Sequence, residues 1–218
     1  MSKSELSRLT QADTLFADAI ANLEPGKIAI DCGANVGKYT LEMARTGADV
    51  FAFEPDELVL PNIGRRVDDY ENVQVINAAV GIKSGSINLY RSKNYHNNQA
   101  RESKNNTTMS ADQVFSNPKM SETFEDGEMA TVELVDLPKF INEKLKSYGC
   151  ISLLKVDIEG AEVELMEEML AQRLFDKIDL TVIETHEFLF PDLKDRYSSI
   201  RKALREVYPP EVVNFDWR

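Results

Sequence analysis

The sequence predicts an α/β fold in which a mostly parallel, twisted sheet is covered by helices on both faces. Short apolar runs recur at residues 27–31, 49–53, 73–77, 151–157 and 179–186, and amphipathic stretches separate most of them. Runs of consecutive apolar residues are typical of strands that are buried on both faces of a parallel sheet. In such sheets ligands bind beyond the carboxyl ends of the strands.

The first half of the chain alternates helices and strands. Residues 4–23 carry apolar side chains at helical spacing, and Pro25-Gly26 ends this predicted helix. The first strand is followed by a predicted helix over residues 37–45. After the second strand a helix is predicted to follow Pro55, with apolar residues at Leu58, Leu60, Ile63 and Val67. We expect an N-terminal helical segment, residues 1–26, followed by a single domain.

That domain, residues 27–218, changes its pattern after the third strand. The third strand continues to residue 80, and residues 87–90 alternate like another strand. The short link between the two predicts an antiparallel hairpin. Residues 91–128 are a polar insertion with no strong apolar period, as in functional or disordered loops. A strand over residues 129–134 then precedes a helix that Asp136 opens.

The last third returns to alternating strands and helices. One predicted helix has Val163, Met166 and Met169 on one face. The other covers residues 193–207. Residues 212–215 are the candidate for a final strand. About ten residues follow the last helix, so we expect a shortened edge of the sheet.

Composition limits the classes of partner. The 218 residues have a formal net charge of −12, which argues against a nucleic-acid or anionic-membrane surface. No run of about 18 apolar residues predicts a membrane span, and the N-terminus lacks the apolar core of a signal peptide. We therefore expect a cytoplasmic protein with Cys32 and Cys150 as free thiols. A homo-oligomer is compatible with this composition.

A glycine turn joins the first strand to the second helix. Asp31, Gly33 and Gly37 occur there in the spacing Asp-x-Gly-x-x-x-Gly. A strand that turns through glycines into a helix brings bare backbone and a helix N-terminus close to a ligand. Glu54 ends the second strand, where a carboxylate accepts hydrogen bonds from both hydroxyls of a ribose. Together these residues predict a pocket for an adenosine-containing cofactor.

The same turn distinguishes between cofactors. A dinucleotide site needs Gly-x-Gly-x-x-Gly, which lets a pyrophosphate approach the backbone. This chain lacks the Gly-x-Gly pair, and the carboxylate of Asp31 would repel a pyrophosphate. A carboxylate suits a ligand with an α-ammonium and a sulfonium. The turn therefore favours S-adenosylmethionine over NAD(P) and makes an NAD(P)-dependent oxidoreductase the less favoured alternative.

A second group of polar residues ends the fourth and fifth parallel strands. Asp157 and Glu159 follow one strand, and Glu184 and His186 end the next. These groups can move protons, and they are also oxygen and imidazole ligands that could hold Mg²⁺ or Mn²⁺. We predict no metal and keep a metal-assisted reaction as an alternative. Glu162, in the first turn of the following helix, is expected mainly to complement the helix dipole.

Five segments resemble the FkbM-type methyltransferases, which are class I enzymes with a Rossmann-like fold that use S-adenosylmethionine. The resemblance covers about residues 27–187, and its most specific part is Lys-x-Asp-x-Glu-Gly-x-Glu. The matching segments are Ile30–Gly37, Ala52–Pro55, Asn77–Gly81, Leu154–Glu162 and Ile183–His186.

The resemblance implies a role for each matching position. Asp157 would lie near the transferred methyl group, with Glu159 and His186 on the acceptor side as candidate general bases. The remaining cofactor positions would be Asp31, Gly33, Ala34, Asn35 and Gly37 at the methionine part, Glu54 and Pro55 at the ribose, and Asn77 and Ala78 at the adenine.

The family implies methylation of a hydroxyl on a small molecule, sugar or lipid. Two alternatives stay open from the residues themselves. One is a non-catalytic module that binds a small molecule or a partner through the 91–128 insertion. The other is the oxidoreductase, which the glycine turn disfavours. The acidic composition also disfavours strongly anionic acceptors.

Overall fold

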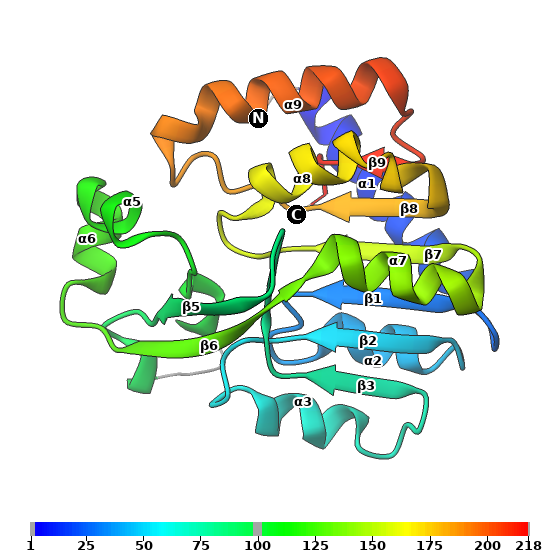
Figure 1. Ribbon diagram of the computed structural model, residues 1–218, viewed down its shortest axis with the longest axis horizontal. Helices are drawn as coiled ribbons and strands as arrows, with labels where there is room; N and C mark the ends of the chain where they lie inside the picture. The colour runs from blue at the N-terminus through cyan, green and yellow to red at the C-terminus, as the bar shows by residue number, and fades with distance from the viewer. Residues whose placement is uncertain (1–2, 98–101, 218) are drawn as a thin grey trace.

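The computed structural model describes residues 3–97 and 102–217, and it confirms the predicted fold class (Figure 1). Six parallel strands form the main sheet in the order β3-β2-β1-β7-β8-β9. The strands are β1 (Ile28–Cys32), β2 (Asp49–Phe53), β3 (Val73–Ile76), β7 (Ile151–Val156), β8 (Ile178–Ile183) and β9 (Val213–Asn214).

The strand order reverses at β1, which pairs with β2 on one side and with β7 on the other. A reversal of this kind opens a crevice beyond the carboxyl ends of the central strands, where ligands bind in open α/β sheets. The glycine turn after β1 and the segment Asp157–Glu159 after β7 therefore lie side by side at this crevice, where the Asp157 N–H donates a hydrogen bond to the Cys32 carbonyl at 3.0 Å.

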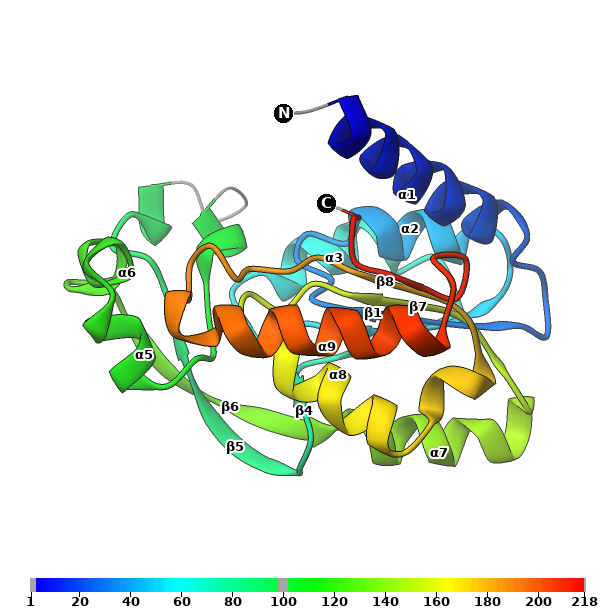
Figure 2. The same cartoon turned by 90° about the horizontal axis from the view of Figure 1, so that it is seen from above.

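Helices cover both faces of the main sheet (Figure 2). On one face Ala12 and Phe16 of the N-terminal helix and Met43 pack against Val50 and Leu153. The larger core lies on the opposite face. The first layer contains α1 (Lys3–Ala21), α2 (Lys38–Ala44) and α3 (Leu60–Val67), and the second contains α7 (Leu137–Tyr148), α8 (Glu162–Ala171) and α9 (Lys194–Val207).

A second sheet corrects the predicted hairpin. It consists of β4 (Ala79–Gly81), β5 (Gly85–Tyr90) and β6 (Met129–Asp136) in the order β4-β6-β5. The prediction that β5 pairs with the end of the third strand was wrong, because β6 lies between β4 and β5. With eight residues, β6 is long enough to pair parallel with β4 at one end and antiparallel with β5 along most of its length.

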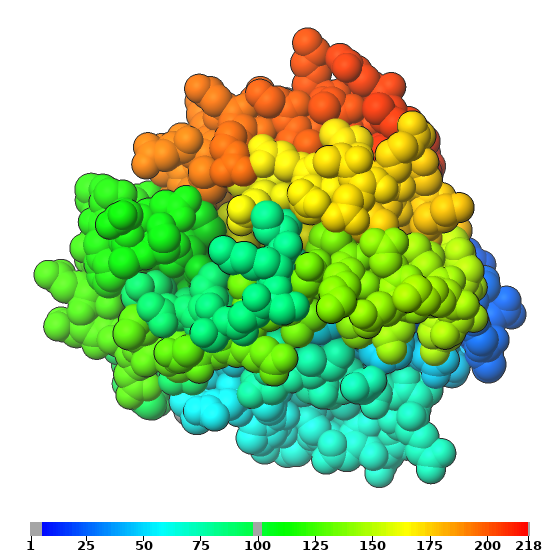
Figure 3. Space-filling view, in the orientation of Figure 1, coloured from blue at the N-terminus to red at the C-terminus, as the bar shows by residue number. Residues whose placement is uncertain are grey.

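The polar insertion has more regular structure than its sequence suggested. Val114, Met120 and Phe124 are buried in the larger core, although each helix is too short to show an apolar period. Figure 3 shows that this part packs against the rest of the molecule as a continuous surface. Its elements are η1 (Tyr95–Asn97), η2 (Ser103–Asn105), α5 (Ala111–Ser116) and α6 (Pro118–Phe124).

Buried polar contacts attach the insertion to the loop after β2. Asp56 is fully buried, and its carboxylate accepts hydrogen bonds from Arg91 at 2.7 Å and from Asn106 at 2.8 Å. Buried, charge-assisted hydrogen bonds of this kind fix geometry better than exposed pairs do. The insertion is therefore held as one wall of the crevice.

The C-terminal edge of the sheet is short, as predicted. β9 contributes two residues and pairs parallel with β8. The remaining short helices are η3 (Leu174–Lys177) before β8 and η4 (Pro191–Leu193) before α9. Cys32 and Cys150 are both free thiols. Within the described ranges, the structure has no helix that is both long and apolar enough to cross a bilayer.

Candidate active site

A cavity of about 460 Å³ lies beyond the carboxyl ends of β1, β2 and β7. This size is within the range of small-molecule and cofactor sites. Its walls include most of the predicted cofactor residues, namely Gly33, Ala34, Asn35, Glu54, Pro55, Ala78 and Asp157, together with Glu159. Four predicted residues are outside the wall: Asp31, Gly37, Asn77 and His186. The cavity is also lined by residues that no sequence pattern assigned to a site, among them Lys155, Ser103, Asn106 and Trp217.

Gly33 brings the backbone of β1 against that of β7. Its φ of +79° is in the left-handed region, and a Cβ there would lie 1.8 Å from the carbonyl oxygen of Asp157. Gly37 also has a positive φ, of +77°, but a Cβ there would meet Ile63 of α3 at 3.2 Å. Gly33 therefore shapes the cavity, whereas Gly37 permits the close packing of α2 on α3.

Glu54 is held in the cavity wall by the backbone. One carboxylate oxygen accepts a hydrogen bond from the Asn35 N–H at 2.8 Å, and the other accepts one from the Asp56 N–H at 2.9 Å. Burial raises the pKa of Glu54 to about 7, against the effect of these hydrogen bonds. Asn77 donates to the backbone carbonyls of Glu54 and Pro55 and so supports this loop from outside the wall.

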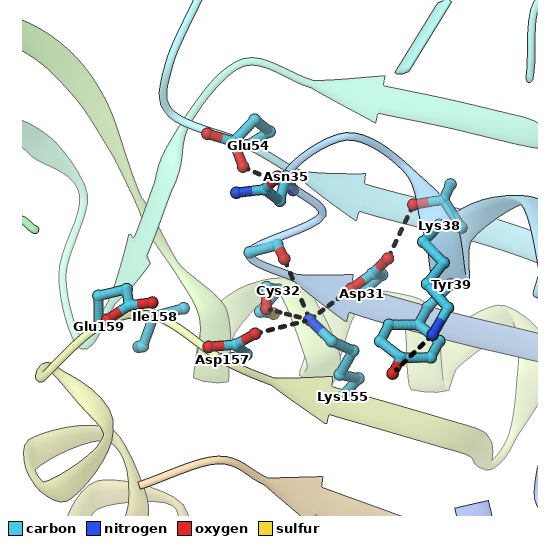
Figure 4. Close-up of polar contacts among 12 residues, drawn as sticks. Asp31, Cys32, Asn35, Lys38, Tyr39, Glu54, Lys155, Asp157, Ile158 and Glu159 are labelled. Atoms are coloured by element: carbon cyan, nitrogen blue, oxygen red, sulfur yellow. Dashed lines mark hydrogen bonds and ion pairs between the residues drawn. The ribbon is translucent and has the colours of Figure 1, made fainter. Parts of the chain in front are cut away.

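Asp31 lies beneath the cavity, where it is neutralised by Lys155 (Figure 4). Its side chain is fully buried, 3.1 Å from the Lys155 Nζ, and it accepts a hydrogen bond from Thr40 at 2.7 Å. Asp31 therefore lies outside the cavity wall, and a direct contact between it and a cationic ligand stays a prediction. Because Lys155 Nζ is also 3.7 Å from Asp157, it links the carboxylate beneath the cavity to one in its wall.

Lys155 is the most consequential residue that the sequence analysis did not assign to the site. Its Nζ donates to the carbonyl of Gly33 at 3.0 Å, so it also fixes the glycine turn. Burial opposes its charge, but Asp31 and Asp157 outweigh burial and raise the pKa of Lys155 above its ordinary value. One feature of the sequence could have indicated this role. Lys155 lies inside an apolar strand, and Asp31 lies in the strand that pairs with it.

Glu159 occupies a tight turn after β7 and faces the cavity. Its φ is +55°, and Thr107 of the insertion donates a hydrogen bond to its carbonyl oxygen at 2.7 Å. Burial raises the pKa of the Glu159 carboxyl to about 8, although the positive charge of His186 opposes this. At neutral pH this group is therefore close to its own titration range.

His186 lies behind Glu159 and is oriented by Glu162. Its Nδ1 is 2.9 Å from Glu162, and its Nε2 is 3.2 Å from Glu159. Burial lowers the pKa of His186, but the three surrounding carboxylates, of Glu162, Glu159 and Asp157, raise it to about 10. The imidazole is therefore an imidazolium at neutral pH, which makes it a poor general base.

Glu162 does more than complement the helix dipole. It is fully buried and also accepts hydrogen bonds from Tyr197 at 2.7 Å and from the Gly160 N–H at 3.1 Å. Burial opposes its ionisation, yet the hydrogen bonds from His186, Tyr197 and Gly160 lower the pKa of Glu162. An ionised Glu162 therefore keeps His186 protonated and in place.

Asp157, Glu159 and His186 have ligand atoms within 4.8 Å of one another. This spacing and this donor set suit a divalent cation. A protonated His186 supplies positive charge at the same place. This charge can balance the carboxylates of Asp157 and Glu159 without a metal. The absence of a metal stays a prediction.

We expect the imidazole of His186 to titrate near pH 10 rather than near its ordinary value of 6.5. Because the folded pKa is raised, the contribution of His186 to the free energy of unfolding is complete below about pH 6.5 and is lost as the pH rises through about 10. Histidine NMR over pH 5 to 11, with His96→Gln to assign the signals, would check this. Glu162→Gln should lower the midpoint, and an unchanged midpoint would contradict the assigned cause.

Several known proteins resemble this chain. Methyltransferase 1 of Beauveria bassiana is 27% identical over 179 residues, which cover 78% of this chain and 70% of that protein. Methyltransferase sdnD of Sordaria araneosa is 28% identical over 181 residues, which cover 77% of this chain and 70% of that protein. Ribosomal RNA small subunit methyltransferase A of Thermotoga neapolitana is 36% identical over 76 residues, or 34% of this chain and 29% of that protein.

A solved structure and a family model complete the comparison. The structure of a SAM-dependent methyltransferase from Thiobacillus denitrificans with S-adenosyl-L-homocysteine covers 94% of this chain and 86% of that one, at 14% identity and a TM-score of 0.26. The family model described as the Methyltransferase FkbM domain matches residues 31–207. This match covers most of the chain and both sides of the cavity, so the chain belongs to the FkbM methyltransferase family.

Proposed function

We propose that this protein transfers a methyl group from S-adenosylmethionine to a hydroxyl on a small molecule, sugar or lipid. Membership in the FkbM methyltransferase family supports the reaction class. The observation that carries the proposal is the one cavity that is lined by Glu54, the glycine turn and Asp157 and also by Glu159. It therefore offers a cofactor-binding part and a proton-accepting part in one space.

The residues of the cavity fit S-adenosylmethionine. Glu54 would accept hydrogen bonds from the ribose hydroxyls, and Ala78 with Val80 would provide an apolar surface for the adenine. Asp157 suits the α-ammonium group, because its Oδ1 atom is buried and has no hydrogen-bond partner among the described residues. Glu184 adds a second carboxylate to the same wall.

The chemistry divides between cofactor and protein. Bound S-adenosylmethionine would supply a methyl group that is already activated by its sulfonium, so the protein mainly has to align the acceptor and accept its proton. Of the two candidate bases, we propose Glu159, because it lines the cavity and its raised pKa makes it a better proton acceptor than an ordinary carboxylate.

His186 then has a supporting role. Its imidazolium, 3.2 Å from the Glu159 carboxylate, orients that group and attracts its negative charge. The acceptor hydroxyl would give its proton to a carboxylate oxygen of Glu159 as the new carbon–oxygen bond forms. The proton would later pass from Glu159 to solvent and restore the base.

Calorimetric titration tests the cofactor directly. We expect the wild-type protein to bind S-adenosylmethionine and S-adenosylhomocysteine, and Glu54→Gln to weaken binding about 10- to 100-fold, since a hydrogen bond to a charged group is worth about 1.5–3 kcal/mol. Glu57→Gln, an exposed change three residues away, is the matched control. Asp31 is unsuitable for this test because its substitution would disturb the buried pair with Lys155.

The outcome also decides between the proposed function and its alternative. No binding of either compound to the folded wild-type protein would contradict the proposal and favour the non-catalytic binding module. Equal weakening by Glu54→Gln and Glu57→Gln would contradict the role of Glu54 in holding the ribose.

A further inference from the structure

A second hollow, of about 650 Å³, lies beside the cavity between α1, α9 and the C-terminal residues 215–217. We call it the arginine groove, because Arg8, Arg201 and Arg205 line it. Figure 2 shows the C-terminal segment running between α1 and α9. Apolar side chains complete the walls of the groove, which are those of Leu9, Phe188 and Phe215.

The groove borders the candidate active site. Glu184 and Trp217 line both spaces. Trp217 is only 3% exposed, and its ring is packed 5.0 Å from that of Phe16 and 5.4 Å from that of Tyr39. This packing makes Trp217 a fixed partition between the groove and the cavity, and Glu184 lies at the same boundary.

The three arginines retain capacity for a further anion. Arg8 and Arg205 share the carboxylate of Asp216 at 3.8 and 3.6 Å, which is too far for a hydrogen bond. Arg201 donates to Thr185 and Glu187, yet its Nε is buried without a hydrogen-bond partner in the described part of the chain. A guanidinium has five N–H donors, and Arg8 and Arg205 make no hydrogen bond within the described ranges, so these two arginines can receive an anion.

The position of the guanidinium groups is also fixed. Those of Arg201 and Arg205 lie 5.7 and 5.2 Å from the centre of the Phe215 ring. This contact holds two cationic groups over one apolar surface. The acidic groups of the groove are Glu184, Glu187 and Asp216, and their charges balance those of the three arginines. The whole chain has a net charge of −12. An anion would therefore bind through the donor geometry rather than through a strong field.

We propose that the arginine groove binds an anionic group, a carboxylate or a phosphate, of the methyl acceptor. The acceptor would be a hydroxylated molecule with an apolar body, whose hydroxyl reaches the cavity past Glu184 and Trp217. This inference rests on the proposed function. It assigns an anionic group to the acceptor, although the overall acidity of the chain disfavours strongly anionic acceptors.

The test uses small anions with and without an apolar body. Ligand-observed NMR would follow benzoate, inorganic phosphate and uncharged benzyl alcohol on the protein loaded with S-adenosylhomocysteine. We expect benzoate to bind more tightly than benzyl alcohol, and the double variant Arg8→Gln, Arg205→Gln to weaken benzoate binding about tenfold. Arg196→Gln is the control, since this arginine of α9 pairs with Glu167 and does not line the groove.

A second measurement separates this inference from the proposed function. Acceptors would be screened for methylation in matched pairs, one anionic and one neutral, and the anionic member should be preferred by wild type but not by the double variant. Equal binding of benzoate to wild type and double variant, or preference for neutral acceptors, would overturn the inference while S-adenosylhomocysteine still binds. Failure to bind S-adenosylhomocysteine would instead contradict the proposed function.

Discussion

Replacing Lys155 with methionine should lower the free energy of unfolding by about 3–5 kcal/mol, which is the usual cost of removing one member of a buried ion pair. Lys155 is 2% exposed and Asp31 is fully buried, so water cannot replace the lost ammonium group. The variant would also leave the carbonyl of Gly33 without its side-chain donor. Urea denaturation monitored by circular dichroism measures the change.

Two controls define the cause of this loss. Lys202→Met removes an exposed lysine of α9 and should change stability by less than about 0.5 kcal/mol. The double variant Asp31→Asn, Lys155→Met should be more stable than Lys155→Met alone, because it removes the unpaired charge and keeps an acceptor for Thr40. A double variant that is no more stable would show that lost packing, rather than an uncompensated carboxylate, explains the effect.

The parallel part of the fold was predictable because each element carries a local signal. Consecutive apolar residues identified the strands, and Asp136 and Gly149 mark the two ends of α7. The pairing of β4, β5 and β6 had no such signal. It depends on β6, which is about 40 residues away from β5 in the sequence. β6 lies between β4 and β5, although the short turn that joins those two strands predicted that they would pair.

The candidate site was predictable to the extent that it depends on backbone position. Strand order places the ends of β1, β2 and β7 together, which brings Gly33, Glu54 and Asp157 to one cavity. The sequence could not show which carboxylates line the cavity. Asp31 is paired with Lys155 from the neighbouring strand, whereas Asp157 and Glu184 remain in the cavity wall.

Contributions from distant segments were also hidden. Trp217 reaches the cavity from the C-terminus, and Ser103 and Asn106 reach it from the polar insertion. No local spacing links these residues to the glycine turn. The contacts of Asp56 with Arg91 and Asn106, and that of Thr107 with the Glu159 carbonyl, explain why the insertion forms a wall.

Replacing Glu159 with glutamine should lower kcat by about 10²- to 10⁴-fold, the usual contribution of a general base. Glutamine keeps the size of the side chain but cannot accept the proton of the acceptor hydroxyl. The affinity for S-adenosylmethionine should change little, since we assign Glu159 to the acceptor side. Glu164→Gln, an exposed change in the first turn of α8, is the matched control.

The pH profile then tests the partnership with His186. A base must be ionised, and burial raises the pKa of Glu159 to about 8, so kcat should rise with pH through about 8. His186→Gln removes the positive charge that lowers this pKa, so the rise should move to higher pH. A structural role alone would reduce activity without moving the profile. The opposite result, in which Glu159→Gln keeps full activity while His186→Gln abolishes it, would make His186 the base. Its imidazole would then have to be neutral, although three carboxylates surround it.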